Sequence, residues 1–338
     1  MKILYGVQAT GQGHISRARA MAEAFQALDI DVTWLFSGRP RDRLFDMTPF
    51  GNFEHREGLT FYSEAGKVYY LKTLLNAKPI TFIKDVLSLN VSHYDLVVTD
   101  YEPVTAWAGR LRNKPVIGLG HQYAFGKATP KSGDTWLQRL VMTTFAPVAR
   151  PVGLHWASFD RHVLPPILDL PAEPPGDKLD HVMVYLPFED QDHVTAWLQG
   201  FPQYSFKQYA ANIDDSEQGN VSRRRANIAG FKRDLAQCRG VICNSGFELI
   251  SECLHWRKPV LTRPLSGQME QLSNATALKQ LGYASVMDGL DSSTTIDWLQ
   301  NTPVAPEVSF SDVAGALAKW LASGATDPIE QIQRKLWA

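Results

Sequence analysis

Short runs of apolar residues alternate with amphipathic stretches along the chain. Residues 2–7, 31–38 and 95–100 are apolar almost throughout, and we predict a strand for each. Residues 15–29 carry apolar side chains at helical spacing, which predicts a helix between the first two strands. Strands that are apolar throughout and alternate with helices are typical of a parallel sheet covered on both faces. The chain therefore opens with a predicted β-loop-α-β unit.

The same alternation restarts in the second half of the chain. Residues 165–180 are dense in Pro and Gly and lack periodicity, as in a linker between domains. After this break, helices alternate with predicted strands at 181–188, 204–211, 240–243 and 259–264. Two successive units of this kind predict an α/β fold with two Rossmann-like domains that face a central cleft.

The expected domain boundaries follow from these patterns. The divisions are an N-terminal domain at 1–162, a linker at 163–180, a C-terminal domain at 181–322 and a final helix at 323–338. The final helix is expected to pack back on the N-terminal domain.

Composition narrows the classes of protein to which the chain can belong. It has 338 residues, 44% hydrophobic and 20% charged, which is enough to bury two cores. A net charge of -1 argues against a nucleic-acid partner, which would require a surplus of Lys and Arg. No apolar run is long enough to span a bilayer, and the first residues lack the zones of a signal peptide. Cys238, Cys243 and Cys253 show no zinc-binding spacing, so reduced thiols in a cytoplasmic protein are expected.

A short turn precedes the helix that is predicted to begin at Phe247. The turn, Asn244-Ser245-Gly246, lies at the carboxyl end of a predicted strand. The first amides of a helix have no partner within it and lie at the positive end of the helix dipole. Gly246 has no side chain to block their approach, so the turn is suited to bind a diphosphate. A Ser-Gly turn is also a common helix cap, and this motif alone leaves both interpretations open.

Three further motifs follow this turn in one register. SGFELISE at 245–252 is followed by KPVL at 258–261, GQMEQ at 267–271 and NA at 274–275. This series resembles the two-domain glycosyltransferases of the GT-B superfamily. It is similar in particular to an uncharacterised prokaryotic family related to the peptidoglycan N-acetylglucosaminyltransferase and the UDP-glycosyltransferases.

The resemblance implies how a nucleotide-sugar donor, expected to be UDP-linked, would be held. Its diphosphate would lie against the turn and the first helical residue: Asn244, Ser245, Gly246 and Phe247. Glu252 would bind the ribose hydroxyls, and residues 227–231 occupy the place where relatives hold the base. The donor sugar would contact the polar residues of the later motifs: Glu270, Gln271 and Asn274. The donor is a substrate, and neither a cofactor nor a metal is expected, because no DxD-type pair stands in a suitable loop.

Two features depart from the superfamily pattern. Glu248 stands beside the expected diphosphate site and would repel the donor unless its side chain turns away. The first strand of the C-terminal domain ends in an acidic loop with Glu189 and Asp190, where relatives have a Gly-Ser loop. Arg263, at the end of a later strand, is a candidate phosphate cation, and an ordinary exposed arginine is the alternative.

The loop after the first strand offers a general base. ATGQGH resembles the Gly-rich loop and following histidine of the acceptor domain in the same superfamily, so the N-terminal domain is expected to bind the acceptor. Gly11 and Gly13 let the backbone approach substrate, and His14 lies at a positive helix end that favours the neutral ring. Asp100 resembles the aspartate that pairs with this histidine in the UDP-glycosyltransferases. Glu102 is the alternative carboxylate, and His121 is the alternative histidine. The other interpretation of His14 is that it caps the helix or binds the acceptor without transferring a proton.

These expectations combine into a glycosyltransferase of the hexosyltransferase type that acts on a hydroxyl acceptor. An inverting transfer needs a base, because the hydroxyl loses its proton as it attacks the anomeric carbon. Lipid-linked or cell-envelope polysaccharide acceptors are candidates, since residues 67–85 mix aromatics, leucines and lysines that suit the inner face of a membrane. A helix pair packed on the sheet is the alternative for that stretch.

Two other functions fit parts of the pattern. A 2-epimerase-like isomerase shares the fold and the Ser-Gly turn, but those enzymes carry Arg-Pro-Glu where this chain has Gln12-Gly13-His14. A nucleotide-sugar-binding subunit without chemistry is the third interpretation, and in it the predicted base would be absent or misplaced.

Overall fold

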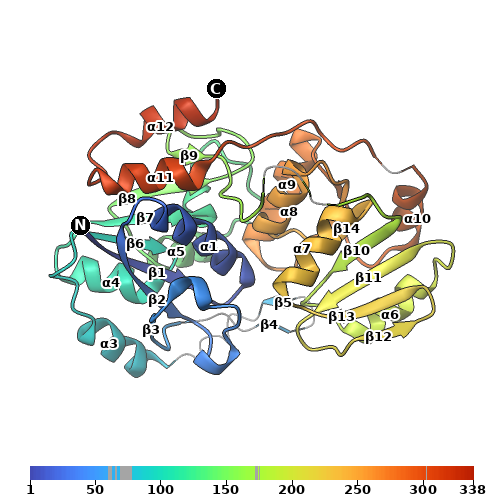
Figure 1. Cartoon of the computed structure of the whole chain (residues 1–338), viewed down its shortest axis with the longest axis horizontal. Helices are drawn as coiled ribbons and strands as arrows, with labels where there is room; N and C mark the ends of the chain where they lie inside the picture. Colours follow the sequence, from blue (N-terminus) through green and yellow to red (C-terminus); the bar gives the residue numbers. More distant parts are fainter. Residues whose placement is uncertain (60–62, 65–66, 69–77, 172–173, 175, 302) are drawn as a thin grey trace.

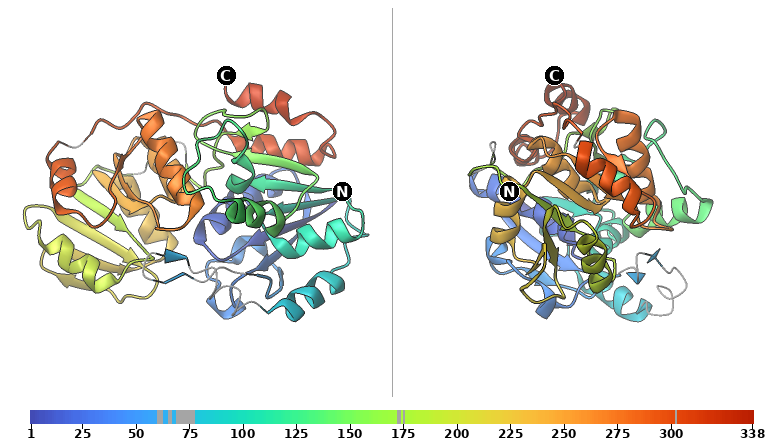
Figure 2. Two further views of the ribbon diagram at one scale, coloured as in Figure 1. Left: turned by 180° about the vertical axis from the view of Figure 1, so that it is seen from behind. Right: turned by 90° about the vertical axis from the view of Figure 1, so that its right-hand side faces the viewer.

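The computed structural model contains two large sheets that lie side by side with helices around them (Figure 1). It describes the chain except residues 60–62, 65–66, 69–77, 172–173, 175 and 302. The view from behind shows the same two-part arrangement, and in the view from one end the two parts overlap (Figure 2). The expected α/β architecture with two Rossmann-like sheets is confirmed.

The N-terminal sheet is parallel and has the strand order β3-β2-β1-β6-β7-β8-β9. Its strands are β1 (Lys2–Gln8), β2 (Asp31–Ser37), β3 (Glu54–His55), β6 (Leu96–Asp100), β7 (Val116–Gly120), β8 (Arg150–Leu154) and β9 (Val163–Leu164). A separate antiparallel pair is formed by β4 (Ser63–Glu64) and β5 (Lys67–Val68). The associated helices are α1 (Gln12–Gln26), α3 (Pro79–Ser88), α4 (Pro103–Leu111) and α5 (Trp136–Phe145), with short 3₁₀ turns at Arg41–Arg43, Thr48–Phe50 and His121–Ala124.

The C-terminal sheet repeats this plan with the order β12-β13-β11-β10-β14-β15-β16. Its strands are β10 (His181–Tyr185), β11 (Ser205–Ala210), β12 (Ser216–Gln218), β13 (Val221–Arg225), β14 (Gly240–Asn244), β15 (Val260–Arg263) and β16 (Ser285–Val286), of which only β12 pairs antiparallel among the described strands. The helices that follow are α6 (Gln191–Gln199), α7 (Ile228–Gln237), α8 (Phe247–His255), α9 (Met269–Leu281), α10 (Ser292–Asn301), α11 (Val313–Ala322) and α12 (Ile329–Leu336).

Each sheet has a point at which the strand order reverses. In the N-terminal sheet β1 lies between β2 and β6, and in the C-terminal sheet β10 lies between β11 and β14. The loops that follow the two central strands at such a point leave in opposite directions and open a crevice beyond the strand ends. The loops after β1, β6, β10 and β14 are therefore where the fold places a ligand.

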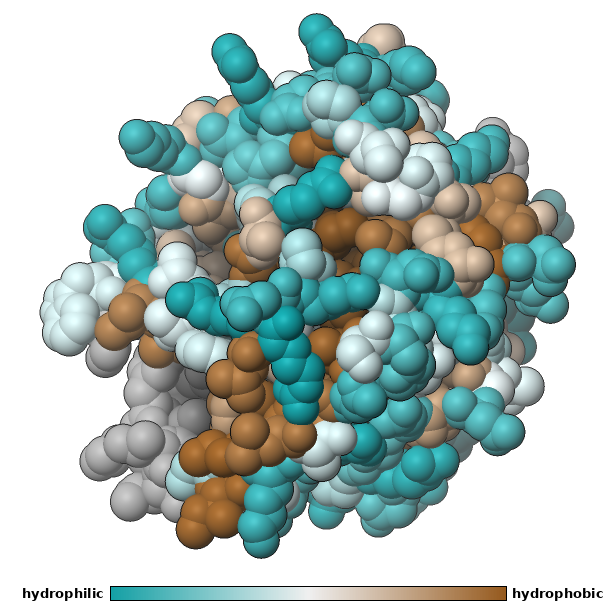
Figure 3. Space-filling model, turned by 90° about the vertical axis from the view of Figure 1, so that its left-hand side faces the viewer, coloured by the Kyte–Doolittle hydropathy of each residue, from teal (hydrophilic) through white to brown (hydrophobic). Residues whose placement is uncertain are grey.

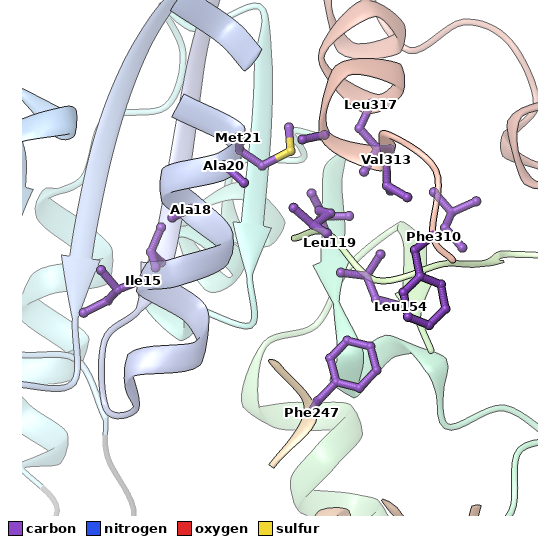
Figure 4. Packing of buried hydrophobic residues seen from close by; sticks show 14 of the residues in the cluster. Ile15, Ala18, Ala20, Met21, Leu119, Leu154, Phe247, Phe310, Val313 and Leu317 are labelled. Carbon is purple, nitrogen blue, oxygen red and sulfur yellow. The ribbon is translucent and has the colours of Figure 1, made fainter. Parts of the chain in front are cut away.

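One apolar core runs through both halves of the molecule. Phe247 at the start of α8 is 3% exposed and lies beside Leu154 of β8, which belongs to the other sheet (Figure 4). The ring of Phe247 also packs against Trp156, with centroids 5.1 Å apart, and the indole Nε1 of Trp156 donates to Ser251 Oγ at 2.8 Å. Because buried apolar and polar contacts both cross this interface, the two sheets are docked rather than merely tethered.

The chain returns to the N-terminal sheet earlier than the boundary at 322 implies. We expected residues 313–322 within the C-terminal domain, but α11 packs against α1, with Val313 and Leu317 in one cluster with Met21 (Figure 4). Near the end of the chain, Trp337 Nε1 donates to the carbonyl of Val163 at 2.8 Å. The apolar face of α11 decides this position, since it packs on α1.

Three other sequence features are placed by the structure. The cysteines 238, 243 and 253 are free and buried, and burial raises the pKa of Cys238 to about 11 and of Cys243 to about 12. Residues 69–77 of the aromatic and lysine-rich stretch lie outside the described residues, and α3 follows them. Within the described parts of the chain, no helix is long and apolar enough to cross a membrane.

Candidate active site

The carboxyl ends of β1 and β6 bring His14 and Asp100 together. After β1 the chain turns through a loop to Gly11, which caps α1, and His14 lies in the first turn of that helix. Asp100 is the last residue of β6 and is paired in register with Val7 of β1. Nδ1 of His14 lies 2.7 Å from Oδ1 of Asp100. The structure thus joins the two side chains that the sequence analysis paired across 86 positions.

Arg17, which lies one helical turn beyond His14, was not among the residues predicted for the site. Its side chain is 1% exposed, and it donates from Nε to Asp100 Oδ2 at 2.8 Å and from Nη2 to Oδ1 at 2.6 Å. Two parallel bonds from one guanidinium to one carboxylate are the strongest form of this pair. Burial acts to raise the pKa of Asp100, but Arg17 and His14 outweigh it and hold that pKa below its ordinary value. Asp100 is therefore a buried anion.

The contacts of His14 select one tautomer. Its Nδ1 lies near both Asp100 and Nη2 of Arg17, the latter at 3.0 Å. An ionised carboxylate only accepts, and its contact with Nδ1 is the shorter of the two, while Nη2 of Arg17 already donates to Asp100 Oδ1 at 2.6 Å. We therefore assign to Nδ1 a proton that is donated to Asp100. Nε2 then holds the lone pair, and no described residue is hydrogen-bonded to it. A side chain that is 16% exposed in this tautomer can take a proton at Nε2.

Glu248 reaches this pair from the other sheet. It lies in the first turn of α8, and its Oε1 accepts a hydrogen bond from Nη1 of Arg17. A Cβ at position 13 would stand 2.7 Å from Oε2 of Glu248, so Gly13 admits the carboxylate. Glu248 turns toward Arg17, which offsets part of its charge and reduces the expected repulsion of a diphosphate, although Arg17 is shared with Asp100.

The first three amides of α8 have no acceptor in the part of the chain that the structure describes. No described residue accepts from the amides of Phe247, Glu248 and Leu249, and Gly246 at the cap supplies no side chain. The amides of Ser245 and Gly246, which we expected to be available, donate instead to Arg263 O at 3.2 Å and Asn244 O at 2.8 Å. The unpaired amides at the start of the helix therefore begin at Phe247, directly after the Ser-Gly step.

The side chains of the turn have structural roles. Ser245 is fully buried, and its hydroxyl lies 2.9 Å from that of Thr262. Asn244 donates from Nδ2 to the carbonyl of Arg263 at 3.2 Å. These bonds fix β14 to β15 at the turn, so the hydroxyl of Ser245 is used within the protein.

A cavity of about 120 Å³ lies between the sheets, lined by Glu248, Leu249 and Glu252 of α8. Its walls include Gly13 and Phe45 from the N-terminal half, with Tyr185, Asn227, Phe231 and Glu252 from the other half. Glu252 is 4% exposed, burial raises its pKa against the opposing effect of Lys232, and Lys232 Nζ is ion-paired with it. The expected ribose residue and the expected base-binding segment thus line one cavity.

Two of the three residues expected to contact the donor sugar turn inward. Asn274 is fully buried, with Oδ1 2.7 Å from Nε2 of His121 and Nδ2 donating to Ser245 O at 3.0 Å. Gln271 is 5% exposed, and its Oε1 accepts from the amide of Leu265 at 3.0 Å. Glu270 remains partly exposed. Asn274 therefore bridges the two sheets rather than facing solvent.

The alternative histidine and carboxylate are both engaged in packing. The ring of His121 stacks on Phe247 with centroids 4.0 Å apart, and burial lowers its pKa. Glu102 is fully buried and accepts from the amides of Val104 at 2.8 Å and Thr105 at 2.7 Å, which caps α4. Neither side chain is placed as His14 and Asp100 are.

Two further charges at the crevice neutralise each other. Arg263, the candidate phosphate cation, is ion-paired with Glu189 of the acidic loop after β10. Both side chains are mostly shielded, with 15% and 11% exposed, and burial lowers the pKa of Arg263. Asp190, next to Glu189, caps α6 by accepting from the amide of His193 at 2.8 Å. Both acidic side chains of this loop therefore make contacts within the protein.

Comparison with known proteins decides the family. The model of glycosyl transferase family 1 matches residues 1–303, which include both sheets. The chain belongs to glycosyl transferase family 1. An uncharacterised glycosyltransferase of Methanosarcina acetivorans is 30% identical to this family 1 chain over 137 residues, 39% of this chain and 35% of that protein. The match thus spans about a third of that relative's length.

Solved structures show the same fold over nearly the whole chain. The Streptomyces sp. SF2575 glycosyltransferase SsfS6, complexed with thymidine diphosphate, is 15% identical, with a TM-score of 0.59 and 99% of each chain covered. The spinosyn rhamnosyltransferase SpnG, also complexed with thymidine diphosphate, is 13% identical, with a TM-score of 0.52 and 100% of each chain covered. MurG of Acinetobacter baumannii is 13% identical, with a TM-score of 0.50, and 99% of this chain and 93% of that chain are covered. This family 1 chain therefore has the two-domain fold of these glycosyltransferases.

Proposed function

We propose that this glycosyltransferase moves a sugar from a nucleoside-diphosphate donor to a hydroxyl acceptor, with His14 as general base and inversion at the anomeric carbon. The observation that carries the proposal is the state of His14. Its Nδ1–H is fixed on the buried anion Asp100, which leaves Nε2 as a proton acceptor. The free amides of Phe247 to Leu249 lie on the opposite side of the domain interface.

The proposed reaction uses both sides of this interface. The acceptor hydroxyl gives its proton to Nε2 of His14 while its oxygen forms a bond to the anomeric carbon. The bond from that carbon to the diphosphate oxygen breaks on the opposite face, and the electron pair leaves with the diphosphate. Asp100 stabilises the imidazolium that forms, as the aspartate of a catalytic triad does. The amides and dipole of α8 stabilise the developing negative charge, and we propose that they do so without a metal ion.

The donor contacts are proposed from the cavity between the sheets. Glu252 lines it and is proposed to bind the ribose, while residues 227–231 are proposed to hold the base. Glu270, which lies outside the lining of this cavity, is proposed to contact the sugar. Two structural neighbours were solved with thymidine diphosphate, which supports a pyrimidine nucleoside diphosphate as the leaving group. We expect the donor nucleotide to be UDP, and binding of TDP should be measured beside it for comparison.

The acceptor is proposed to be presented at a membrane surface, as for a lipid-linked or envelope polysaccharide. Ile80, Ile83 and Leu87 follow one face of α3 and are 70%, 55% and 58% exposed. An apolar area occupies the lower part of the face seen in Figure 3, the side on which α3 lies in Figure 1. Lys84 is exposed on the same helix and suits anionic headgroups.

Nucleotide binding and turnover test the proposal separately. UDP or TDP is expected to raise the melting temperature of the protein, and release of the diphosphate from a sugar nucleotide should need an acceptor and persist in EDTA. His14→Ala should bind the nucleotide with unchanged affinity and lose about a hundredfold or more in kcat. Unchanged turnover in His14→Ala would rule out the base. Interconversion of two sugar nucleotides without diphosphate release would favour an isomerase instead.

A further inference from the structure

Arg17 connects the His14–Asp100 pair of one domain to a carboxylate of the other. On one side it forms two hydrogen bonds to Asp100, and on the other its Nη1 donates to Glu248 of α8. The three charged groups form a continuous chain that ends at His14. Arg17 and Glu248 are 231 positions apart in the sequence, so only docking of the two sheets brings them together.

Arg17 and Asp100 are buried, so their charges depend on protein partners rather than on water. The Arg17 side chain is 1% exposed and Asp100 is fully buried, so neither charge is solvated by water. A buried charge is tolerated only when its hydrogen-bonding groups are matched by partners. Asp100 matches Nε and Nη2, and Glu248 matches Nη1. Separation of the domains removes the partner of Nη1 and leaves the guanidinium held from one side alone.

The local backbone is shaped for this contact. Gly13 faces the Glu248 carboxylate, and any side chain there would begin 2.7 Å from Oε2. That distance is too short for a carbon atom beside a carboxylate oxygen. Glu248 is thus seated directly against the loop that carries His14, not merely near Arg17.

The geometry points to Arg17 as a positioning residue that aligns Asp100 and His14 only while Glu248 of the nucleotide-binding domain is docked on it. The ring of His14 is then held in its reactive orientation while the two domains are docked. It loses part of that restraint when the domains separate. This inference rests on the proposed function for the role of His14 as a base. The ion pair and its coupling to the domain interface do not depend on that role.

A double-mutant cycle tests the inference. Glu248→Gln should lower kcat about tenfold with little change in the KM for the donor, since the loss is in alignment of the base. Arg17→Lys keeps the charge but loses the paired hydrogen bonds, and kcat should fall about a hundredfold. In the Arg17→Lys background, Glu248→Gln should cost less than about twofold, because its partner is already impaired. Ser273→Ala is the matched control: Ser273 Oγ accepts from the amide of Ser132 at 3.0 Å across the same interface, away from His14, so kcat should stay unchanged.

The outcomes separate this inference from the proposed function. Independent, multiplying effects of the two substitutions would overturn the coupling, and so would a raised donor KM with unchanged kcat in Glu248→Gln. If wild type releases no diphosphate from any sugar nucleotide, the proposed function fails, and the same cycle is measured by urea unfolding. There, Glu248→Gln should destabilise wild type but not Arg17→Lys, and equal destabilisation of both would overturn the ion-pair coupling itself.

Discussion

Replacing Asp100 by Asn probes the charge at the centre of the site without changing its size. The substitution removes the anion that pairs with Arg17 and accepts the Nδ1–H of His14. Breaking one partner of a buried ion pair costs about 3–5 kcal/mol. Glu248 still accepts one hydrogen bond from Arg17, so we expect a loss near the lower end, about 3 kcal/mol. Turnover should fall about 10³-fold or more, because His14 loses the acceptor that fixes its tautomer.

The stability effect of Asp100→Asn should depend on pH in a defined direction. The pKa of Asp100 in the folded state lies below its ordinary value of 3.8, so the ionised carboxylate stabilises the folded state above that value. The difference between wild type and variant should be constant above about pH 5 and should shrink as the pH falls below 3.8 toward the folded-state pKa. In that range the carboxylate of Asp100 in the wild type becomes protonated and loses its negative charge, which the variant lacks at every pH.

Urea unfolding followed by circular dichroism between pH 3 and pH 8 measures both effects. Asp192→Asn is the matched control, because Asp192 is also ion-paired, with Arg223, but its side chain is 85% exposed. An exposed pair contributes little, so the control should unfold close to wild type at every pH. The reasoning is refuted if Asp100→Asn has the same free energy of unfolding as wild type at pH 7. It is also refuted if the difference between the two is the same at pH 3 as at pH 7.

Two further predictions concern the interface. Glu252→Gln removes the charge proposed to bind the ribose. Steady-state kinetics should show the donor KM rising about tenfold with kcat nearly unchanged. A fall in kcat alone would contradict the assignment. Ser251→Ala leaves the buried Nε1–H of Trp156 without its acceptor, and urea unfolding should show a loss of about 1–3 kcal/mol, whereas no loss would mean that this bond does not hold the sheets together.

The sequence determined the local elements and the loops that carry the site. Buried strands such as β1 and β14 are apolar throughout, and this pattern is encoded by neighbouring residues. The loop with His14 and the turn at Gly246 could be found because they stand directly after such strands. Asp100 was found for the same reason, at the end of the next strand in the sheet.

Only the tertiary structure decided which side chains meet across the interface. In the sequence, Arg17 is one of two arginines on a predicted helix, and its role becomes visible only when the sheets dock and place Glu248 against it. Asn274 reads as a polar motif residue, yet packing of α9 against His121 buries it completely. Periodicity reports which face of an element is buried, but not what covers it, because that depends on how two separately formed sheets fit together.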